Sequence, residues 1–96
     1  MAQVTVVAKV TAKQEAVEAV KAEVLKLIEP TRREEGCILY TLHQDDSDPA
    51  VFMFYETWES PAHLDRHMKT EHFTRYVAAV DGLLHDKVVN RLTRIA

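Results

Sequence analysis

Residues 51–59, VFMFYETWE, restrict the possible folds more than any other part of the chain. Aromatic and apolar side chains occupy both alternating sets of positions, which is typical of a β-strand covered on both faces. A sheet built around this strand needs a cover on each side, because a bare face of large aromatic groups is rare in a stable monomer. One set is Val51, Met53 and Tyr55, and the other is Phe52, Phe54 and Trp58.

The sequence on either side of this strand predicts three more strands. Residues 37–44 alternate in the same way, and the polar turn at residues 45–49 joins the two runs into a hairpin. Residues 3–11 are rich in valine at every second position and predict an earlier strand. Residues 86–95 predict the last strand of the chain.

The segment between the first two predicted strands has the apolar spacing of a helix. A stripe of apolar residues from Val17 to Ile28 predicts an amphipathic helix that begins at about residue 13. We expect Pro30 to end this helix, because proline cannot continue the hydrogen-bond ladder from inside. Residues 31–34 have the spacing of a capping box and predict a short helical turn closed by Gly36.

A second helical region follows the hairpin. Ser60 and Pro61 suit the N-cap and the first position of a helix, and a further helical piece is expected over roughly residues 71–83, after a break near Thr70. The order is strand, helix, strand, strand, helix, strand. This order predicts one ferredoxin-like α+β domain over residues 1–96, with an antiparallel sheet and helices on one face.

The uncovered face of that sheet predicts an oligomer. Burial of apolar surface contributes ~25 cal/mol per Å², so covering two such faces would stabilise an assembly by many kcal/mol. We therefore expect a homodimer whose two sheets pack face to face.

Composition excludes several classes of protein. Hydrophobic residues make up 47% of the 96 residues and charged residues 28%, which is typical of a folded globular chain. The formal net charge of −3 and the scattered basic residues argue against a nucleic-acid partner. No apolar run approaches the ~20 residues of a membrane span, and the first residues contain no basic targeting region. With Cys37 as the single cysteine, we expect a cytoplasmic protein with no membrane partner.

Residues suited to chemistry gather in the middle of the chain. Three of the five histidines lie within residues 63–72, and six of the seven aromatic residues lie within residues 52–76. His67 and His72 either move a proton near neutral pH or are hydrogen-bonded core histidines. His63 and His67 have the spacing of half a metal site, but no second half is recognisable, so we expect no metal.

Glu56 and Trp58 lie on the same face of the central strand as Phe52 and Phe54. A carboxylate on an apolar face must find a partner or have its pKa raised. Glu56 therefore has three possible roles: it orients a histidine, acts as a base, or forms a salt bridge across the dimer. The indole N–H of Trp58 needs a hydrogen-bond partner wherever it is buried.

Residues 31–73 resemble the antibiotic biosynthesis monooxygenase (ABM) domain family, and are most similar to its small quinol monooxygenase branch. Three motifs carry the resemblance. They are R-x-E-x-G-C at Arg32–Cys37, E-x-W-x-S at Glu56–Ser60, and H-x-x-T-x-H-F at His67–Phe73. With the flanking strands, the resemblance extends over nearly the whole chain.

The resemblance implies a dimeric α+β barrel with a pocket between sheet and helices in each subunit. It also implies oxidation of a quinol or an aromatic polyketide-like phenol by O2, without metal, flavin or another cofactor. His67 or His72 would accept the proton, and Glu56 would orient that histidine or bind a substrate hydroxyl. The implied pocket residues are Phe54, Trp58, Met68 and Phe73.

Two other functions remain open from the sequence. Relatives with this fold isomerise small phosphorylated sugars, and that reaction would need an anion site among the nearby basic residues. The other alternative is a non-catalytic protein that binds a small molecule or acts under stress, since fold alone does not determine function. The basic candidates for the anion site are Arg32, Arg33, Arg66 and Lys69.

Overall fold

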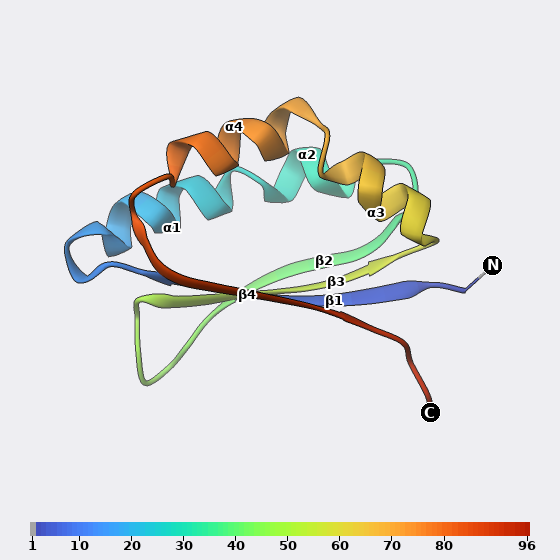
Figure 1. Cartoon of the computed structure of the whole chain (residues 1–96), viewed down its shortest axis with the longest axis horizontal. Helices are drawn as coiled ribbons and strands as arrows, with labels where there is room; N and C mark the ends of the chain where they lie inside the picture. The colour runs from blue at the N-terminus through green and yellow to red at the C-terminus, as the bar shows by residue number, and fades with distance from the viewer. Residues whose placement is uncertain (1) are drawn as a thin grey trace.

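The computed structural model describes residues 2–96. Strands and helices follow the predicted order, with each helical region divided into shorter pieces (Figure 1). The elements are β1 (Val4–Ala12), η1 (Gln14–Ala16), α1 (Val17–Leu25), α2 (Ile28–Arg32), β2 (Cys37–Gln44), β3 (Val51–Trp58), α3 (Pro61–His67), α4 (Glu71–Ala79) and β4 (Leu84–Leu92). Within residues 2–96, no helix is both long enough and apolar enough to cross a membrane.

The four strands form one antiparallel sheet in the order β2-β3-β1-β4. The helices all lie on one side of this sheet (Figure 1). The predicted ferredoxin-like α+β fold is therefore confirmed. The pairing register places Val6 of β1 and Tyr40 of β2 on either side of Glu56 in β3. Glu56 is therefore surrounded by the two neighbouring strands on the helix-covered face.

The hydrophobic core lies between the helices and the sheet. Trp58 is fully buried and Phe52 is 1% exposed, and both belong to the face of β3 that the helices cover. Met53 and Tyr55, on the opposite face, are 37% and 44% exposed. A single chain thus covers one of the two apolar faces of β3. The helical side chains buried in the core include Val20, Val24, Leu27, Leu64 and Tyr76.

The first helical region divides before Pro30, so the prediction that this proline ends the helix is wrong. The regular part of α1 ends at Leu25, and Pro30 lies in the first turn of α2. Proline is tolerated there because the first backbone N–H groups of a helix have no partner within it. The predicted capping role of Thr31 is also wrong, since Thr31 is buried inside α2. Gly36 does close the segment, with a φ of +86°.

The second helical region begins and divides where the sequence predicted. The Ser60 side chain accepts a hydrogen bond from the His63 backbone N–H, and Pro61 is the first helical residue of α3. Thr70 caps α4 by accepting from the Phe73 backbone N–H. Regular helix ends at Ala79, four residues before the predicted end at residue 83, and β4 begins two residues earlier than predicted.

Gly36 and Gly82 provide a matched test of packing at the turn that precedes β2. Both have positive φ, +86° and +81°, so an alanine strains the backbone at either position. A Cβ atom on Gly36 would also overlap the ring of His63, whose Nδ1 lies 2.8 Å from the Ser60 hydroxyl oxygen. A Cβ atom on Gly82 would meet nothing within 4 Å beyond its chain neighbours. We expect Gly36→Ala to lower the free energy of unfolding by roughly 1–3 kcal/mol more than Gly82→Ala. Urea denaturation measures both values, and equal losses would contradict the close contact.

Candidate active site

One carboxylate oxygen joins two histidines from different helices. Oε2 of Glu34 lies 2.7 Å from Nδ1 of His67 and 2.6 Å from Nε2 of His72. His67 is the last residue of α3, His72 lies in the first turn of α4, and Glu34 lies between α2 and β2. Because a carboxylate only accepts hydrogen bonds, both of these imidazole nitrogens carry their protons. The break near Thr70 therefore brings the two histidines around Glu34.

His67 is enclosed by aromatic rings. Its ring centroid lies 4.8 Å from that of Trp58, 5.0 Å from Phe73 and 5.8 Å from Tyr40. Burial lowers the pKa of His67, and the hydrogen bond to Glu34 only partly opposes that effect. His67 is thus a neutral imidazole near neutral pH, with its proton on Nδ1.

Glu56 is a second buried carboxyl group, on the sheet beneath the helices. It is 5% exposed, and its Oε1 accepts a hydrogen bond of 2.9 Å from the indole Nε1 of Trp58. Burial raises the pKa of Glu56 to about 7, the negative charge of Glu34 adds to the rise, and the indole hydrogen bond opposes it. A carboxyl group with this pKa is suited to exchanging a proton near neutral pH.

An inner cavity of about 80 Å³ lies between the sheet and α4. Its lining is mostly apolar and aromatic, and it includes Tyr40, Phe54 and Phe73 beside Glu56. Tyr76 also lines the cavity, and its buried hydroxyl has no hydrogen-bond partner among residues 2–96. Burial raises the pKa of Tyr76 to about 12, so this hydroxyl is a neutral donor. The cavity therefore combines aromatic walls with the carboxyl group of Glu56 and the hydroxyl of Tyr76, both suited to a phenol, and Lys87 also lines it.

The predicted site residues divide between this cavity and its surroundings. Phe54, Phe73 and Glu56 line it, whereas Trp58 lies outside the lining and holds the Glu56 carboxyl group. Met68 is 39% exposed and does not line the cavity.

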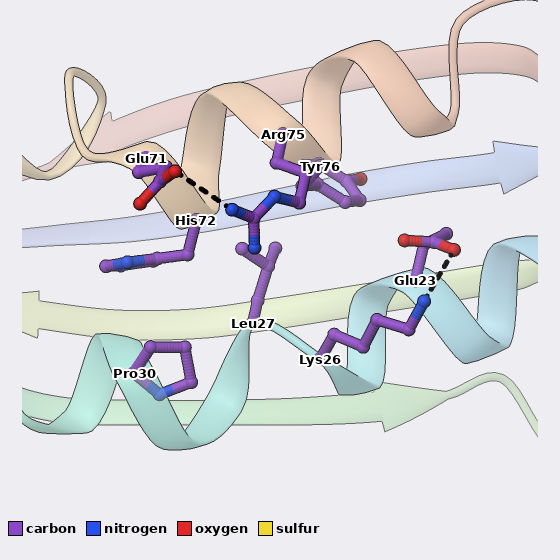
Figure 2. A pocket seen from close by; sticks show the side chains of 8 residues that line it. All are labelled: Glu23, Lys26, Leu27, Pro30, Glu71, His72, Arg75 and Tyr76. Carbon is purple, nitrogen blue, oxygen red and sulfur yellow. Dashed lines mark hydrogen bonds and ion pairs between the residues drawn. The ribbon is translucent and has the colours of Figure 1, made fainter.

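The two histidines lie behind the cavity rather than in its wall. His67 packs against Phe73 and Tyr40, which line it, and His72 lines a separate groove of about 300 Å³ on the outer surface. Figure 2 shows His72 projecting from α4 into the space above Pro30 of α2. Of the three predicted catalytic residues, Glu56 is thus the one that lines the inner cavity.

The hydrogen bonds of the histidines differ from the predicted ones. Glu34, rather than Glu56, is the carboxylate bonded to His67 and His72. Sequence reasoning missed Glu34 as a site residue, although it stands inside the R-x-E-x-G-C motif. His63 does not join this cluster, because its ring is bonded to the Ser60 hydroxyl.

Other candidates occupy structural positions. Burial raises the pKa of the partly buried Cys37 thiol to about 11, so it does not favour a thiolate nucleophile. Arg33 pairs with Glu29, and Arg66 pairs with Glu35. The remaining nearby arginine, Arg32, donates to the backbone carbonyl of Tyr40. Neither these arginines nor Lys69 line the inner cavity, where the basic lining residue is Lys87, so the predicted anion site for a sugar phosphate is not favoured.

The raised pKa of Glu56 predicts a pH dependence of stability. The folded chain binds this proton more tightly than the unfolded chain, whose Glu pKa is near 4.5. The stabilisation from Glu56 is therefore complete at acidic pH and is lost as the pH rises from about 4.5 through about 7.

We expect Glu56→Gln to remove up to about 3 kcal/mol of this pH dependence. The measurement is urea denaturation of both proteins at about pH 5 and about pH 8. Glu59→Gln, which changes an exposed carboxyl group one residue beyond β3, is the matched control and should behave as the unchanged chain. The same pH dependence in Glu56→Gln and in the unchanged chain would contradict the assignment.

Solved structures with the same fold cover nearly the whole chain. The Pseudomonas aeruginosa protein PA3566 is 38% identical, with a TM-score of 0.95 over 100% of this chain and 97% of that one. A crystal structure described as antibiotic biosynthesis monooxygenase is 36% identical, with a TM-score of 0.91 over 97% of this chain and 99% of the other.

Relatives found by sequence point in the same direction. The Escherichia coli K12 protein named "Probable quinol monooxygenase YgiN" is 33% identical over 73 residues, 68% of this chain and 70% of that protein. The uncharacterised Synechocystis protein sll1783 is 36% identical over 69 residues, 72% of this chain, and the match spans only 47% of that protein. Residues 3–79 match the family described as antibiotic biosynthesis monooxygenase. The chain therefore belongs to the antibiotic biosynthesis monooxygenase family.

Proposed function

We propose that this protein is a cofactor-independent monooxygenase that oxidises a quinol or a related aromatic phenol with O2. The observation that carries the proposal is the inner cavity, where the buried Glu56 carboxyl group lies among aromatic side chains. Membership of the family supports the reaction class. The name of the Escherichia coli relative supports a quinol as the first substrate to test.

Oxidation of a phenol by O2 requires from the protein a base and an aromatic site that excludes water. A neutral phenol reacts slowly with O2, and removal of its proton raises the electron density of the ring. One oxygen atom then enters the ring and the other leaves as water. The quinol supplies all four electrons, two through hydroxylation of a ring C–H and two through its own oxidation to the quinone. The balance therefore needs no external reductant.

Glu56 is the first proton acceptor in this proposal. It lines the cavity, and its pKa is about 7. The pKa of a phenol is ~10, so Glu56 is a better match to a phenol than an ordinary carboxyl group is. The hydroxyl of Tyr76 is free to donate to the phenolate oxygen. Glu34 does not line the cavity, but its negative charge helps to raise the pKa of Glu56.

His67 and His72 have a supporting role in the proposal, in place of the proton-accepting role that the resemblance implied. They hold Glu34 in place through hydrogen bonds of 2.7 and 2.6 Å to its Oε2. We therefore expect the two histidines to affect the pKa of Glu56 through Glu34, whereas Glu56 itself contacts the substrate.

Substrate access is proposed between α4 and β4. The volume of about 80 Å³ is small beside the ~300 Å³ or more of common ligand sites, so the cavity must widen on binding. Val77 of α4 and Val89 of β4 line it and are 45% and 54% exposed, which makes this side its outer rim. Movement of α4 away from the edge strand β4 would open the cavity without disturbing the centre of the sheet.

A homodimer is proposed for the uncovered face of the sheet. Exposed apolar side chains come from all the strands except β1, so the face presents a broad surface rather than one isolated group. A second copy would bury the same surface on both partners, as in an isologous dimer. The exposed apolar residues are Leu39, Met53, Tyr55, Val88 and Leu92.

Oxygen consumption tests the reaction and the base. Metal-stripped protein is assayed with a panel of quinols and anthrone-like phenols, against the uncatalysed rate of each. We expect Glu56→Gln to lower kcat by roughly 10²–10⁴-fold, the usual contribution of a general base. His72→Gln should lower it less, and Glu59→Gln should leave it unchanged. No uptake above the uncatalysed rate with any substrate would overturn the proposed function, and full activity of Glu56→Gln would overturn the base.

Sedimentation velocity at micromolar concentration tests the dimer. We expect the unchanged chain to sediment as a dimer and Tyr55→Asp to shift it to the monomer, because the aspartate would place a charge in the centre of the interface. Leu25→Asp is the control, since Leu25 is 55% exposed on α1 in the helical layer. A stable monomer of the unchanged chain would exclude the sheet-to-sheet assembly.

A further inference from the structure

The Glu34–His67–His72 cluster has the composition of a transition-metal site. One oxygen and two nitrogens, Oε2 of Glu34, Nδ1 of His67 and Nε2 of His72, all lie within 4.8 Å of one another. The three residues come from three separate segments, the α2–β2 connection, the end of α3 and the start of α4. The geometry points to a site for one divalent first-row transition-metal ion, of which Zn²⁺ is the representative.

The donor set suits the ion. Imidazole nitrogen and carboxylate oxygen are common Zn²⁺ ligands, and two histidines with one glutamate leave a fourth position for water. Tetrahedral zinc with bonds of about 2.0 Å would separate its ligand atoms by about 3.3 Å. The present separations of 2.7 and 2.6 Å from Glu34 to the two nitrogens must therefore widen by about 0.6 to 0.7 Å.

Both histidine rings can present a nitrogen lone pair to the ion. The ion replaces the proton on Nδ1 of His67 and the one on Nε2 of His72, and each ring can carry a proton on its other nitrogen. The Glu34 carboxylate supplies the negative charge.

The cluster is buried enough to hold an ion and open enough to receive it. The side chains of Glu34, His67 and His72 are 13%, 3% and 23% exposed. His72 lines the outer groove of Figure 2, which gives the ion a route from solvent. His67 is fixed on the inner side by the rings of Trp58 and Phe73. This inference is independent of the proposed monooxygenase activity, because binding is measured without substrate.

Bound metal should also stabilise the fold. The ion would connect the α2–β2 connection to both α3 and α4, and a ligand that binds only the folded chain raises the free energy of unfolding. The Tm of metal-stripped protein should therefore rise with added Zn²⁺ in a concentration-dependent way.

The experiment uses the full metal-stripped chain and two metal ions. Isothermal titration with Zn²⁺ gives stoichiometry and affinity, and the visible absorption of bound Co²⁺ reports the coordination of the ion. We expect one ion per chain, with the affinity lowered at least roughly tenfold in Glu34→Gln and in His72→Gln. These two positions are partly exposed, so their variants perturb the core less than a change at His67, and circular dichroism checks that they fold.

Two control variants distinguish metal binding at the Glu34–His67–His72 cluster from metal binding by other histidine or cysteine side chains. His85→Gln removes an exposed histidine elsewhere, and Cys37→Ser removes the thiol; both should bind as the unchanged chain does. Absence of stoichiometric Zn²⁺ or Co²⁺ binding by the unchanged chain would overturn the inference. Binding that persists unaltered in both Glu34→Gln and His72→Gln, or that is lost equally in His85→Gln or Cys37→Ser, would also overturn it.

Discussion

The rest of the structure depends on removing one face of β3 from water. Trp58 and Phe52 are almost completely buried on that face, and the helices pack over them. The same packing carries Glu56 into the core, because it lies between these aromatic residues on one strand. A buried carboxyl group needs a hydrogen bond, and the indole of Trp58 supplies it at 2.9 Å. The burial of this face of β3 therefore forms the core and also raises the pKa of Glu56.

Two carboxyl groups have different environments and different consequences. Glu34 lies at the edge of the helical layer and is bonded to two histidines, whereas Glu56 lies on the sheet beneath that layer. Tyr40 lines the cavity, and its ring lies 5.8 Å from that of His67, so it contacts both regions. The charge of Glu34 nevertheless helps to raise the pKa of Glu56. The outer cluster and the inner cavity are thus electrostatically connected without a hydrogen bond between them.

Local rules predicted most of the fold and part of the site. Two-residue and helical periodicities located the strands and helices, and Ser60 and Thr70 marked the starts of α3 and α4 because their side chains cap local backbone groups. The error at Pro30 arose because a proline excluded from a helix interior is equally compatible with the first turn of the next helix. Glu34 was missed because its partners stand 33 and 38 residues away, beyond the range of any local pattern.

The sequence by itself determined the order of the elements, the two apolar faces of β3 and the membership of Glu56 in the buried one. These features follow from the alternation of side chains along a strand and from the spacing of apolar residues along a helix. Only the tertiary structure decided which carboxylate the histidines bind and which predicted residues line the cavity. Those contacts depend on how α3 and α4 lie across the sheet, and that placement results from packing between distant segments rather than from neighbouring residues.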